Sequence, residues 1–306
     1  MMKQKLSKFV GSLLGTAIGD SLGARFEDSS AIREVNDLGP RYTDDTAMTI
    51  GVAESLIDQK GFDYWHMTER FIHNYEQEPW RRYGAGPPRI FRMMKNGRRG
   101  FGMLDRDLYP GGSFGNGGAM RVGPVGLLYY DDPLSIREIA YHTTGITHSN
   151  ELALEGAAVQ ACAVALAVLA DPKNIRSAEF LGALRMFTRP GPYQEKLKSI
   201  IKLLDENPSI KEIVYTLGNG IEALRSVPAA IYSFLSTPDF ESAVLYAVSL
   251  GGDTDTIGAM TGAIAGACYG VEGIPVQWRS KVENRQYLEE LAARLWEVKE
   301  EISVPR

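Results

Sequence analysis

The sequence predicts an all-α fold in which several buried helices are wrapped by amphipathic ones. Apolar residues recur at helical spacing over most of the chain. We find no series of alternating apolar and polar runs joined by tight turns, which would indicate a β-sheet. Two long segments are apolar almost all round, as central helices are. No linker composition interrupts the pattern, so we expect a single domain over residues 1–306.

The elements follow in order. A core-facing first helix is predicted where Leu13, Leu14, Ala17 and Ile18 form one stripe. A second helix is expected over residues 43–57, where apolar side chains recur at helical spacing. Residues 151–170 and 255–269 are the two apolar segments, and amphipathic helices are expected near 196–204 and 287–302. Gly258, Gly262 and Gly266 are spaced by four, so a second backbone can approach that face closely.

Two stretches rich in glycine and proline, residues 83–88 and 109–118, break the helical pattern and predict loops. Loops on a rigid scaffold often carry binding residues. Backbone N–H groups of the successive glycines at 111–118 could face a phosphate, although an ordinary structured loop explains the spacing equally well. The segment lacks the Gly-Lys-Ser/Thr ending of a P-loop, and no strand precedes it.

Composition excludes several classes of protein. The net charge is −5 with mixed signs along the chain, and no basic run indicates nucleic-acid binding. Cys162 and Cys268 lie in apolar stretches and are expected to be buried thiols in a reducing compartment. The N-terminal apolar stretch is short and broken by Gly11 and Ser12, and no run of eighteen apolar residues occurs, so neither a signal peptide nor a membrane span is expected. We expect a cytoplasmic protein, and a monomer.

Two acidic motifs stand immediately before helical patterns, Thr-Asp-Asp-Thr at 43–46 and Asp-Thr-Asp-Thr at 253–256. Either motif alone is explained as an N-cap with acids in the first turn. Together they put four carboxylates at the heads of two apolar helices, where unpaired charges are costly. Asp253 and Asp255 converge only if Asp253 precedes the helix, which Gly251 and Gly252 permit.

Oxygen ligands without cysteine or histidine at ligand spacing suit hard cations such as Mg²⁺, Mn²⁺ or Ca²⁺. Four negative charges match two divalent ions. Glu27 by itself is explained as a solvated surface acid, and His148 as a helix cap or packing residue, since neither belongs to a recognisable nucleophile set.

Five motifs in this order resemble the ADP-ribosylglycohydrolase family, from residue 9 to about residue 275. They are Gly-Thr-Ala-Ile-Gly-Asp-Ser-Leu-Gly at 15–23, Tyr-Thr-Asp-Asp-Thr at 42–46, Gly-Asn-Gly-Gly-Ala-Met-Arg at 115–121, Thr-His at 147–148 and Gly-Gly-Asp-Thr-Asp-Thr at 251–256. The Tyr-Gly-Ala-Gly loop at 83–86, Gly112-Ser113, the Leu-Gly-Asn-Gly-Ile run at 217–221 and Ser-Val-Pro at 226–228 are similar to the branch that hydrolyses ADP-ribosyl-serine.

The resemblance implies an orthogonal multi-helix bundle with a centre of two Mg²⁺ ions, for which Mn²⁺ could substitute. The implied metal ligands are Thr43, Asp44, Asp45, Asp253, Asp255 and Thr256. Glu27 matches the family's mobile catalytic glutamate, and Asp44 would help to position the water. The implied ADP-ribose site comprises Gly84, Gly86, Gly112, Ser113, Phe114, Gly115, Asn116, His148 and Ile221. Phe114 replaces the tyrosine usual in the branch, and a second adenine-stacking aromatic falls at Leu108 or Tyr109.

The resemblance therefore predicts a hydrolase that cleaves the bond at the distal ribose of ADP-ribosylated proteins. The expected linkage is O-linked ADP-ribosyl-serine, with poly(ADP-ribose) and O-acetyl-ADP-ribose as further substrates. One alternative is hydrolysis of N-linked ADP-ribosyl-arginine. Another is a non-catalytic, crystallin-like or ADP-ribose-binding protein, which the complete set of metal ligands argues against.

Overall fold

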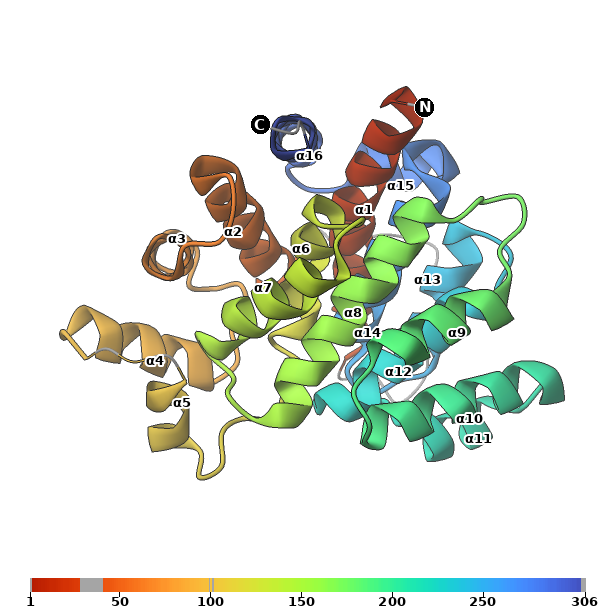
Figure 1. Ribbon diagram of the computed structural model, residues 1–306, viewed down its shortest axis with the longest axis horizontal. Helices are drawn as coiled ribbons and strands as arrows, with labels where there is room; N and C mark the ends of the chain where they lie inside the picture. The colour runs from red at the N-terminus through yellow and green to blue at the C-terminus, as the bar shows by residue number, and fades with distance from the viewer. Residues whose placement is uncertain (1, 28–40, 99, 101, 304–306) are drawn as a thin grey trace.

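A computed structural model describes residues 2–27, 41–98, 100 and 102–303 (Figure 1). The chain is 73% helical, with no strand in the described part, so the all-α prediction is confirmed. One isolated antiparallel bridge joins Gly115 to Glu222. The helices are α1 (Met2–Gly23), α2 (Asp44–Gln59), α3 (Tyr64–Gln77), α4 (Gly86–Lys95), α5 (Met103–Leu108), η1 (Ala119–Arg121), α6 (Gly123–Leu128), α7 (Pro133–Gly145), α8 (Glu151–Leu169), α9 (Ser177–Phe187), α10 (Pro192–Glu206), α11 (Ile210–Leu217), α12 (Ala223–Leu235), α13 (Phe240–Ser249), α14 (Thr254–Tyr269), η2 (Val271–Gly273), α15 (Val276–Lys281) and α16 (Arg285–Ile302).

The two apolar segments form α8 and α14, which lie near the middle of the molecule (Figure 1). Helix α8 is long and apolar enough to cross a membrane, but 78% of its apolar window is buried inside the structure, as in a core helix. Its C-terminal carbonyl groups accept hydrogen bonds from the buried Lys8 of α1, at 2.9 Å for Val168 and 2.6 Å for Ala170. A lysine there satisfies carbonyl groups that have no partner within the helix.

Helices α1 and α14 pack backbone against backbone along a series of glycines. A Cβ atom on Gly262 would lie 2.0 Å from the carbonyl oxygen of Gly15, and one on Gly258 would lie 2.5 Å from that of Gly19. Gly266 faces Gly11 in the same way, at 1.9 Å. The close approach predicted from the spacing in α14 is confirmed, and its partner is a matching series of glycines in α1.

Sequence and structure differ at some helix ends. Helix α10 extends to Pro192–Glu206, where residues 196–204 were expected. The stretch 83–88, expected to be a loop, includes the start of α4, with Pro87 and Pro88 in its first turn. Proline is tolerated there because the first N–H groups of a helix have no intrahelical partner.

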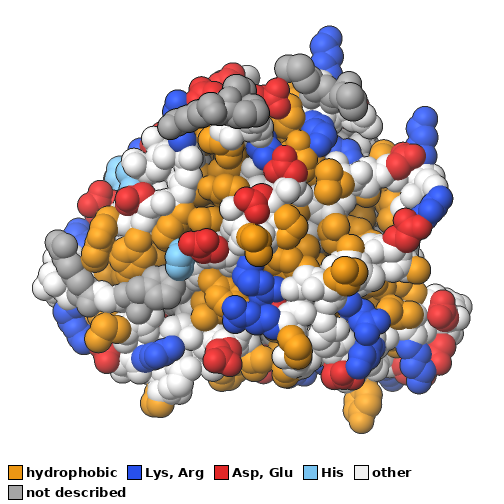
Figure 2. All heavy atoms as spheres, viewed as in Figure 1, with side chains coloured by type: hydrophobic (Ala, Val, Ile, Leu, Met, Phe, Trp, Pro, Cys, Tyr) orange, Lys and Arg blue, Asp and Glu red, His pale blue; other side chains and the backbone are white. Residues whose placement is uncertain are grey.

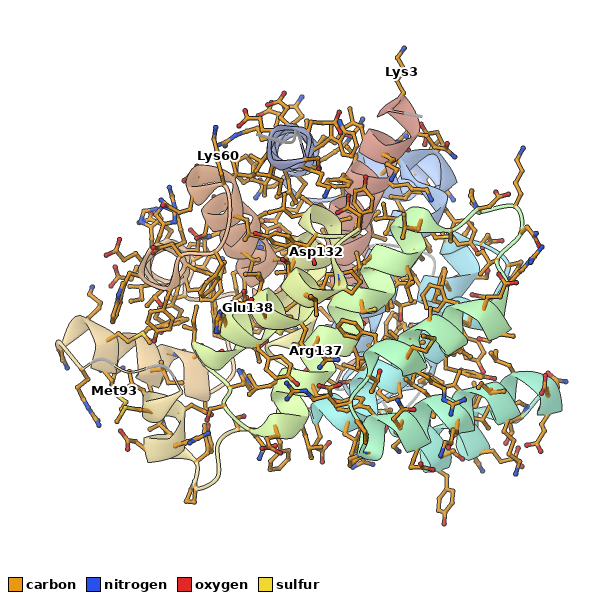
Figure 3. The ribbon with its side chains drawn as sticks, in the orientation of Figure 1. Lys3, Lys60, Met93, Asp132, Arg137 and Glu138 are labelled. Atoms are coloured by element: carbon orange, nitrogen blue, oxygen red, sulfur yellow. The ribbon has the colours of Figure 1, made fainter. Side chains whose placement is uncertain are left out.

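The surface carries charges of both signs. Acidic and basic side chains are interspersed over the face in Figure 2, without separating into regions of one sign. Lys3 and Lys60 point away from the molecule in Figure 3, whereas Arg137 of α7 is directed inward. Its guanidinium lies 2.6 Å from Glu155 of α8.

Candidate active site

The heads of α2 and α14 open onto one cavity of about 270 Å³. It brings together segments that are far apart in the sequence. Its lining residues are Glu27, Asp44, Asp45, Arg82, Gly84, Ala85, Gly86, Pro87, Tyr109, Ser113, Gly115, Asn116, Gly117, Met120, Thr147, His148, Ile221, Asp253, Asp255 and Thr256. Most residues predicted for the site therefore surround one space; Thr43, Gly112 and Phe114 are absent from the lining.

Thr43 is buried and does not line the cavity; it is the N-cap of α2. Its Oγ1 accepts a hydrogen bond from the Asp45 N–H and lies 3.1 Å from Asp45 Oδ2. Asp20 of α1 supports the same helix end, because its carboxylate accepts hydrogen bonds from the Thr43 N–H at 2.9 Å and the Thr46 hydroxyl at 2.6 Å. The N-cap explanation and a ligand role for Asp44 and Asp45 are thus compatible.

The head of α14 has the geometry expected from its sequence. Gly251 and Gly252 have φ of +70° and +73°, in the region that favours glycine. Asp253 stands before the helix and Asp255 in its first turn. Asn116 Nδ2 donates to Asp253 Oδ2 at 2.5 Å and so orients this carboxylate.

Burial and mutual repulsion raise the pKa of these carboxyl groups. Burial is the largest cause for Asp44 and Asp45, whose pKa values lie well above the usual range, and neighbouring aspartates add to the shift. The pKa values of Asp20 and Asp255 rise to about 7 for the same two reasons. Ionising these buried carboxyl groups therefore costs free energy as long as their negative charge is not compensated.

The donor set fits hard cations. Asp45 Oδ1 is fully buried, and no partner for it occurs among the described residues. Carboxylate oxygens of Glu27, Asp253 and Asp255 can lie within 4.8 Å of one another. An unpartnered buried oxygen beside converging carboxylates is what a divalent cation would satisfy.

Glu27 lines the cavity, and its side chain is 37% exposed. The guanidinium of Arg82 lies 3.1 Å from its carboxylate and also donates to the Ala24 carbonyl. Arg82 has a φ of +60°, which is uncommon for a residue with a side chain. Residue spacing alone indicated a surface acid at Glu27, whereas the family resemblance implied a catalytic role; the structure brings its carboxylate close to Asp253 and Asp255.

The glycine loop is held in place by Asp105 of α5. Its buried Oδ2 accepts hydrogen bonds from the N–H groups of Ser113 and Ser149, at 2.8 and 2.7 Å. The N–H groups of Gly112, Gly115 and Asn116 likewise have protein acceptors, so four N–H groups of this loop are not free to face a phosphate.

The flanks of the loop differ in exposure. Phe114 is 52% exposed and lies outside the cavity lining, whereas Tyr109 is part of it. Of the two positions considered for a second aromatic, only Tyr109 lines the cavity among the described residues. Gly86 leaves room for this ring, because a Cβ there would lie 3.3 Å from it.

Sequence reasoning missed three buried residues that support the site: Asp20, Asp105 and Arg121. Asp20 interrupts the apolar pattern of the first helix, and both Asp20 and Arg121 belong to motifs quoted above; these were the available signals. Asp105 gave no such signal, since it lies in a charged stretch and its burial depends on the fold.

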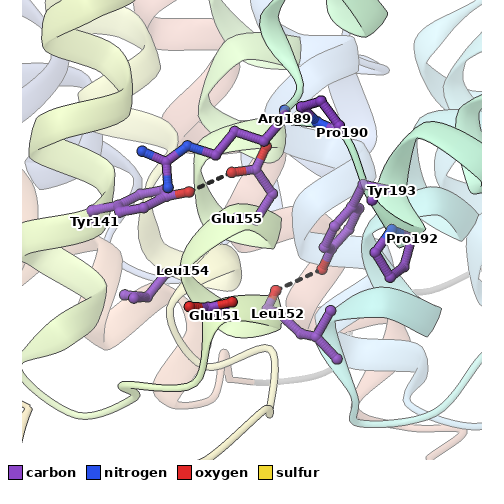
Figure 4. Close-up of a pocket in the computed structure, with 10 residues that line it drawn as sticks. Tyr141, Glu151, Leu152, Leu154, Glu155, Arg189, Pro190, Pro192 and Tyr193 are labelled. Atoms are coloured by element: carbon purple, nitrogen blue, oxygen red, sulfur yellow. Dashed lines mark hydrogen bonds between the residues drawn. The ribbon is translucent and has the colours of Figure 1, made fainter.

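A second cavity, of about 170 Å³, lies between α7, α8 and the start of α10 (Figure 4). Its buried carboxylate is Glu155, which accepts hydrogen bonds from Arg137, Tyr141 and the Arg189 N–H. The Tyr193 hydroxyl donates to the Leu152 carbonyl. Because these polar groups are paired within the protein, the cavity resembles a structural junction more than a catalytic site.

The chain is similar to known proteins over nearly its whole length. A family model described as ADP-ribosylglycohydrolase matches residues 1–303. The proteins named ADP-ribosylhydrolase ARH3 from Bos taurus and Homo sapiens are 36% and 35% identical, each over 96% of this chain and 94% of their own length. ADP-ribosylarginine hydrolase Tri1 of Pseudomonas putida is 28% identical over 96% of this chain and 79% of its own.

A solved structure described as an ADP-ribosylglycohydrolase-related protein complex superposes with a TM-score of 0.76 and 27% sequence identity. The alignment covers 97% of this chain and 99% of that one. The family and its relatives support a hydrolase that acts on ADP-ribose conjugates. The chain belongs to the ADP-ribosylglycohydrolase family.

Proposed function

We propose that this protein uses two Mg²⁺ ions to hydrolyse the bond at the distal ribose of O-linked ADP-ribosyl-serine, with poly(ADP-ribose) and O-acetyl-ADP-ribose as further substrates. The observation that carries the proposal is the convergence of Glu27 and the two aspartate pairs on one cavity. Glycosidic bonds are commonly cleaved with paired carboxyl groups through an oxocarbenium-like transition state. The two buried, unpaired cysteines support a reducing, cytoplasmic location.

The ions would be held by the two helix heads, through Asp44, Asp45, Asp253, Asp255 and Thr256, which line the cavity. Thr43, the N-cap of α2, would support the head that carries Asp44 and Asp45. When bound, Mg²⁺ would orient the ribose hydroxyl groups and stabilise negative charge as a Lewis acid. Mn²⁺ has similar ligand preferences and could replace it.

The chain's own residues would divide the remaining work. Glu27 would donate a proton to the leaving seryl oxygen, because it lines the cavity and is partly exposed, so the protein part of a conjugate could reach it. Asp44 would orient the attacking water. Asn116 holds Asp253 in one orientation. The Ser113 hydroxyl, Tyr109 and His148 would contact ADP-ribose.

The choice of linkage rests on similarity. The relatives named ARH3 share more identity with this chain, over more of their own length, than the arginine hydrolase does. The loop motifs that resemble the serine branch agree with this choice. Hydrolysis of ADP-ribosyl-arginine is the second candidate, favoured by the match to the Pseudomonas putida enzyme.

A substrate panel tests the proposal. Serine-linked and arginine-linked ADP-ribosyl peptides, poly(ADP-ribose) and O-acetyl-ADP-ribose are incubated with the protein in Mg²⁺ and in EDTA, and released ADP-ribose is measured. We expect the highest kcat/KM on the serine-linked peptide, loss of activity in EDTA and recovery on adding Mg²⁺. Preference for the arginine-linked peptide would reverse the linkage, and activity unaffected by EDTA would exclude the metal mechanism.

Variants assign the roles. Glu27→Gln and Asp253→Ala are each expected to lower kcat by about a hundredfold or more, as loss of an acid catalyst or a metal ligand does. Glu76→Ala is the matched control, since Glu76 is an exposed glutamate that pairs with Lys95 away from the cavity. A Glu27→Gln enzyme with the wild-type rate would remove the proton-donor role.

A further inference from the structure

Arg121 is a fully buried cation that follows Met120, a residue that lines the cavity. One guanidinium nitrogen, Nη2, donates hydrogen bonds to the Thr143 carbonyl and to Thr147 Oγ1, both at 2.8 Å. The guanidinium also lies over the Phe71 ring, 4.7 Å from its centre. Burial lowers the pKa of Arg121 to about 9, so the group remains charged at neutral pH. These contacts fix its position and aim one donor at Thr147.

The Thr147 hydroxyl links Arg121 to His148. Its oxygen lies 2.8 Å from His148 Nδ1. A guanidinium can only donate, so the Thr147 oxygen accepts from Arg121 and its own proton needs another acceptor. Within the described part of the chain, His148 Nδ1 is the acceptor that lies within hydrogen-bond distance of the Thr147 hydroxyl. The opposite assignment would leave a buried hydroxyl proton unpaired, which is costly.

The other edge of the His148 ring faces the cavity. A Cβ on Gly117 would lie 2.9 Å from Nε2, and one on Gly115 would lie 3.4 Å from it, so two glycines leave room for this edge. His148, Gly115 and Gly117 all line the cavity. Nε2 has no protein partner among the described residues, and it is not fully buried.

We infer that His148 is held as the neutral tautomer protonated on Nε2, and that Thr147 and Arg121 are the positioning residues that impose it. His148 then presents an N–H donor to the cavity and cannot act as a base at Nε2. Burial and the charge of Arg121 lower the pKa of His148 to about 3, which agrees with a neutral ring.

An N–H donor at this position would bind an oxygen acceptor, such as a phosphate or ribose oxygen. Naming that acceptor as part of ADP-ribose rests on the proposed function; the tautomer itself does not. Four N–H groups of the neighbouring loop already have protein acceptors and cannot bind this ligand oxygen, so the His148 N–H would be a needed donor.

Nuclear magnetic resonance reads the tautomer directly. The full chain is labelled with ¹⁵N-histidine, and two-bond ¹H–¹⁵N correlations are recorded without ligand at pH 7. His148→Gln identifies the His148 signals among those of the four histidines. We expect a protonated Nε2 and an unprotonated Nδ1. A protonated Nδ1, or a doubly protonated ring, would overturn the inference.

Threonine variants test what imposes the tautomer. Thr147→Val keeps the side-chain shape but removes the hydroxyl; we expect the fixed pattern to be lost and the Kd for ADP-ribose to rise about tenfold. Thr147→Ser should restore both. Thr143→Val is the matched control, because the Thr143 hydroxyl is buried without a partner. A wild-type tautomer pattern in Thr147→Val would refute the positioning role.

Calorimetry with ADP-ribose separates the two claims. If the wild-type protein shows the expected tautomer but does not bind ADP-ribose, the proposed function fails and the tautomer assignment stands. If it binds ADP-ribose with a protonated Nδ1, the inference fails and the proposed function stands.

Discussion

Asp20 shows at the scale of one residue how the acidic helix heads are supported. Its side chain is fully buried, and its carboxylate accepts hydrogen bonds from Thr43, the N-cap of α2, and from Thr46 in the first turn. The N–H of Thr43 lies 2.9 and 3.0 Å from the two oxygens. Asp20 therefore adds a second cap to α2, from another helix. Its bonds to Thr43 and Thr46 hold the segment that contains Asp44 and Asp45.

Asp20→Asn is expected to lower kcat at least tenfold and to destabilise the protein by about 1–3 kcal/mol. The carboxylate now accepts hydrogen bonds from the N–H groups of Thr43 and Thr46 and from the Thr46 hydroxyl. An asparagine amide NH₂ group would face some of these donors and could not accept from them. Steady-state kinetics at saturating Mg²⁺ and urea unfolding measure the two effects.

A control distinguishes positioning from stability. Asp63 caps α3 by accepting a hydrogen bond from the His66 N–H at 2.7 Å, away from the cavity. Asp63→Ala should cost about 1 kcal/mol of stability and leave kcat unchanged. If Asp20→Asn loses stability alone and keeps its kcat, Asp20 is only a structural cap.

At the scale of elements, the contact between α1 and α14 determines the geometry of the site. Asp20 lies in the last turns of α1, and Asp253 and Asp255 stand at the head of α14. A Cβ on Gly23 would lie 2.1 Å from the Thr254 carbonyl oxygen, so the two helices touch up to the site itself. The Thr254 hydroxyl donates to the Gly23 carbonyl at 2.8 Å. Close packing of α1 on α14 thus places Asp20 near the acidic head of α14. Because Asp20 also caps α2, the acidic heads of α2 and α14 come together.

Gly262→Ala should destabilise the protein by roughly 2–3 kcal/mol, because its Cβ would overlap the opposing Gly15 backbone, which cannot move aside cheaply. Gly182→Ala in α9 is the matched control. A Cβ there meets nothing within 4 Å, so we expect a gain of about 0.5–1 kcal/mol from helix propensity. Urea unfolding compares the two variants, and equal stabilities would refute the packing argument.

At the scale of the whole molecule, the buried acids link stability to pH and to metal. Asp20 and Asp255 have folded-state pKa values near 7, raised from 3.8. Between these pH values the folded protein binds more protons than the unfolded chain does. The free energy of unfolding therefore falls as the pH rises through this window.

We expect the Tm of the protein in EDTA to fall by on the order of 5 °C from pH 4.5 to pH 7.5. Saturating Mg²⁺ should raise the Tm most at the higher pH, because it binds the ionised folded state. Circular dichroism melts measure both effects. Asp255→Asn should flatten the fall in EDTA, and a Tm that rises with pH in EDTA would contradict the charge argument.

The sequence alone determined the class of fold and the composition of the acidic site. Helical periodicity identified α1, α2, α8, α14 and α16, because burial of one stripe or of a whole helix leaves a pattern in the chain. The pairs Asp44–Asp45 and Asp253–Asp255 were identified by charge counting, since four acids exceed what capping needs. The glycine spacing in α14 predicted a close helix contact, but many helices could have supplied the partner.

Only the tertiary structure decided which residues surround the cavity. It brings Glu27 beside Asp253, because α1 packs on α14 from Gly11 to Gly23, up to the head of α14. It buries Asp105 against Ser149 and joins Arg121 to Thr147, and no local sequence pattern encodes either contact between these separate segments. Periodicity records how each residue faces the core, whereas the identity of its neighbours depends on how the helices pack.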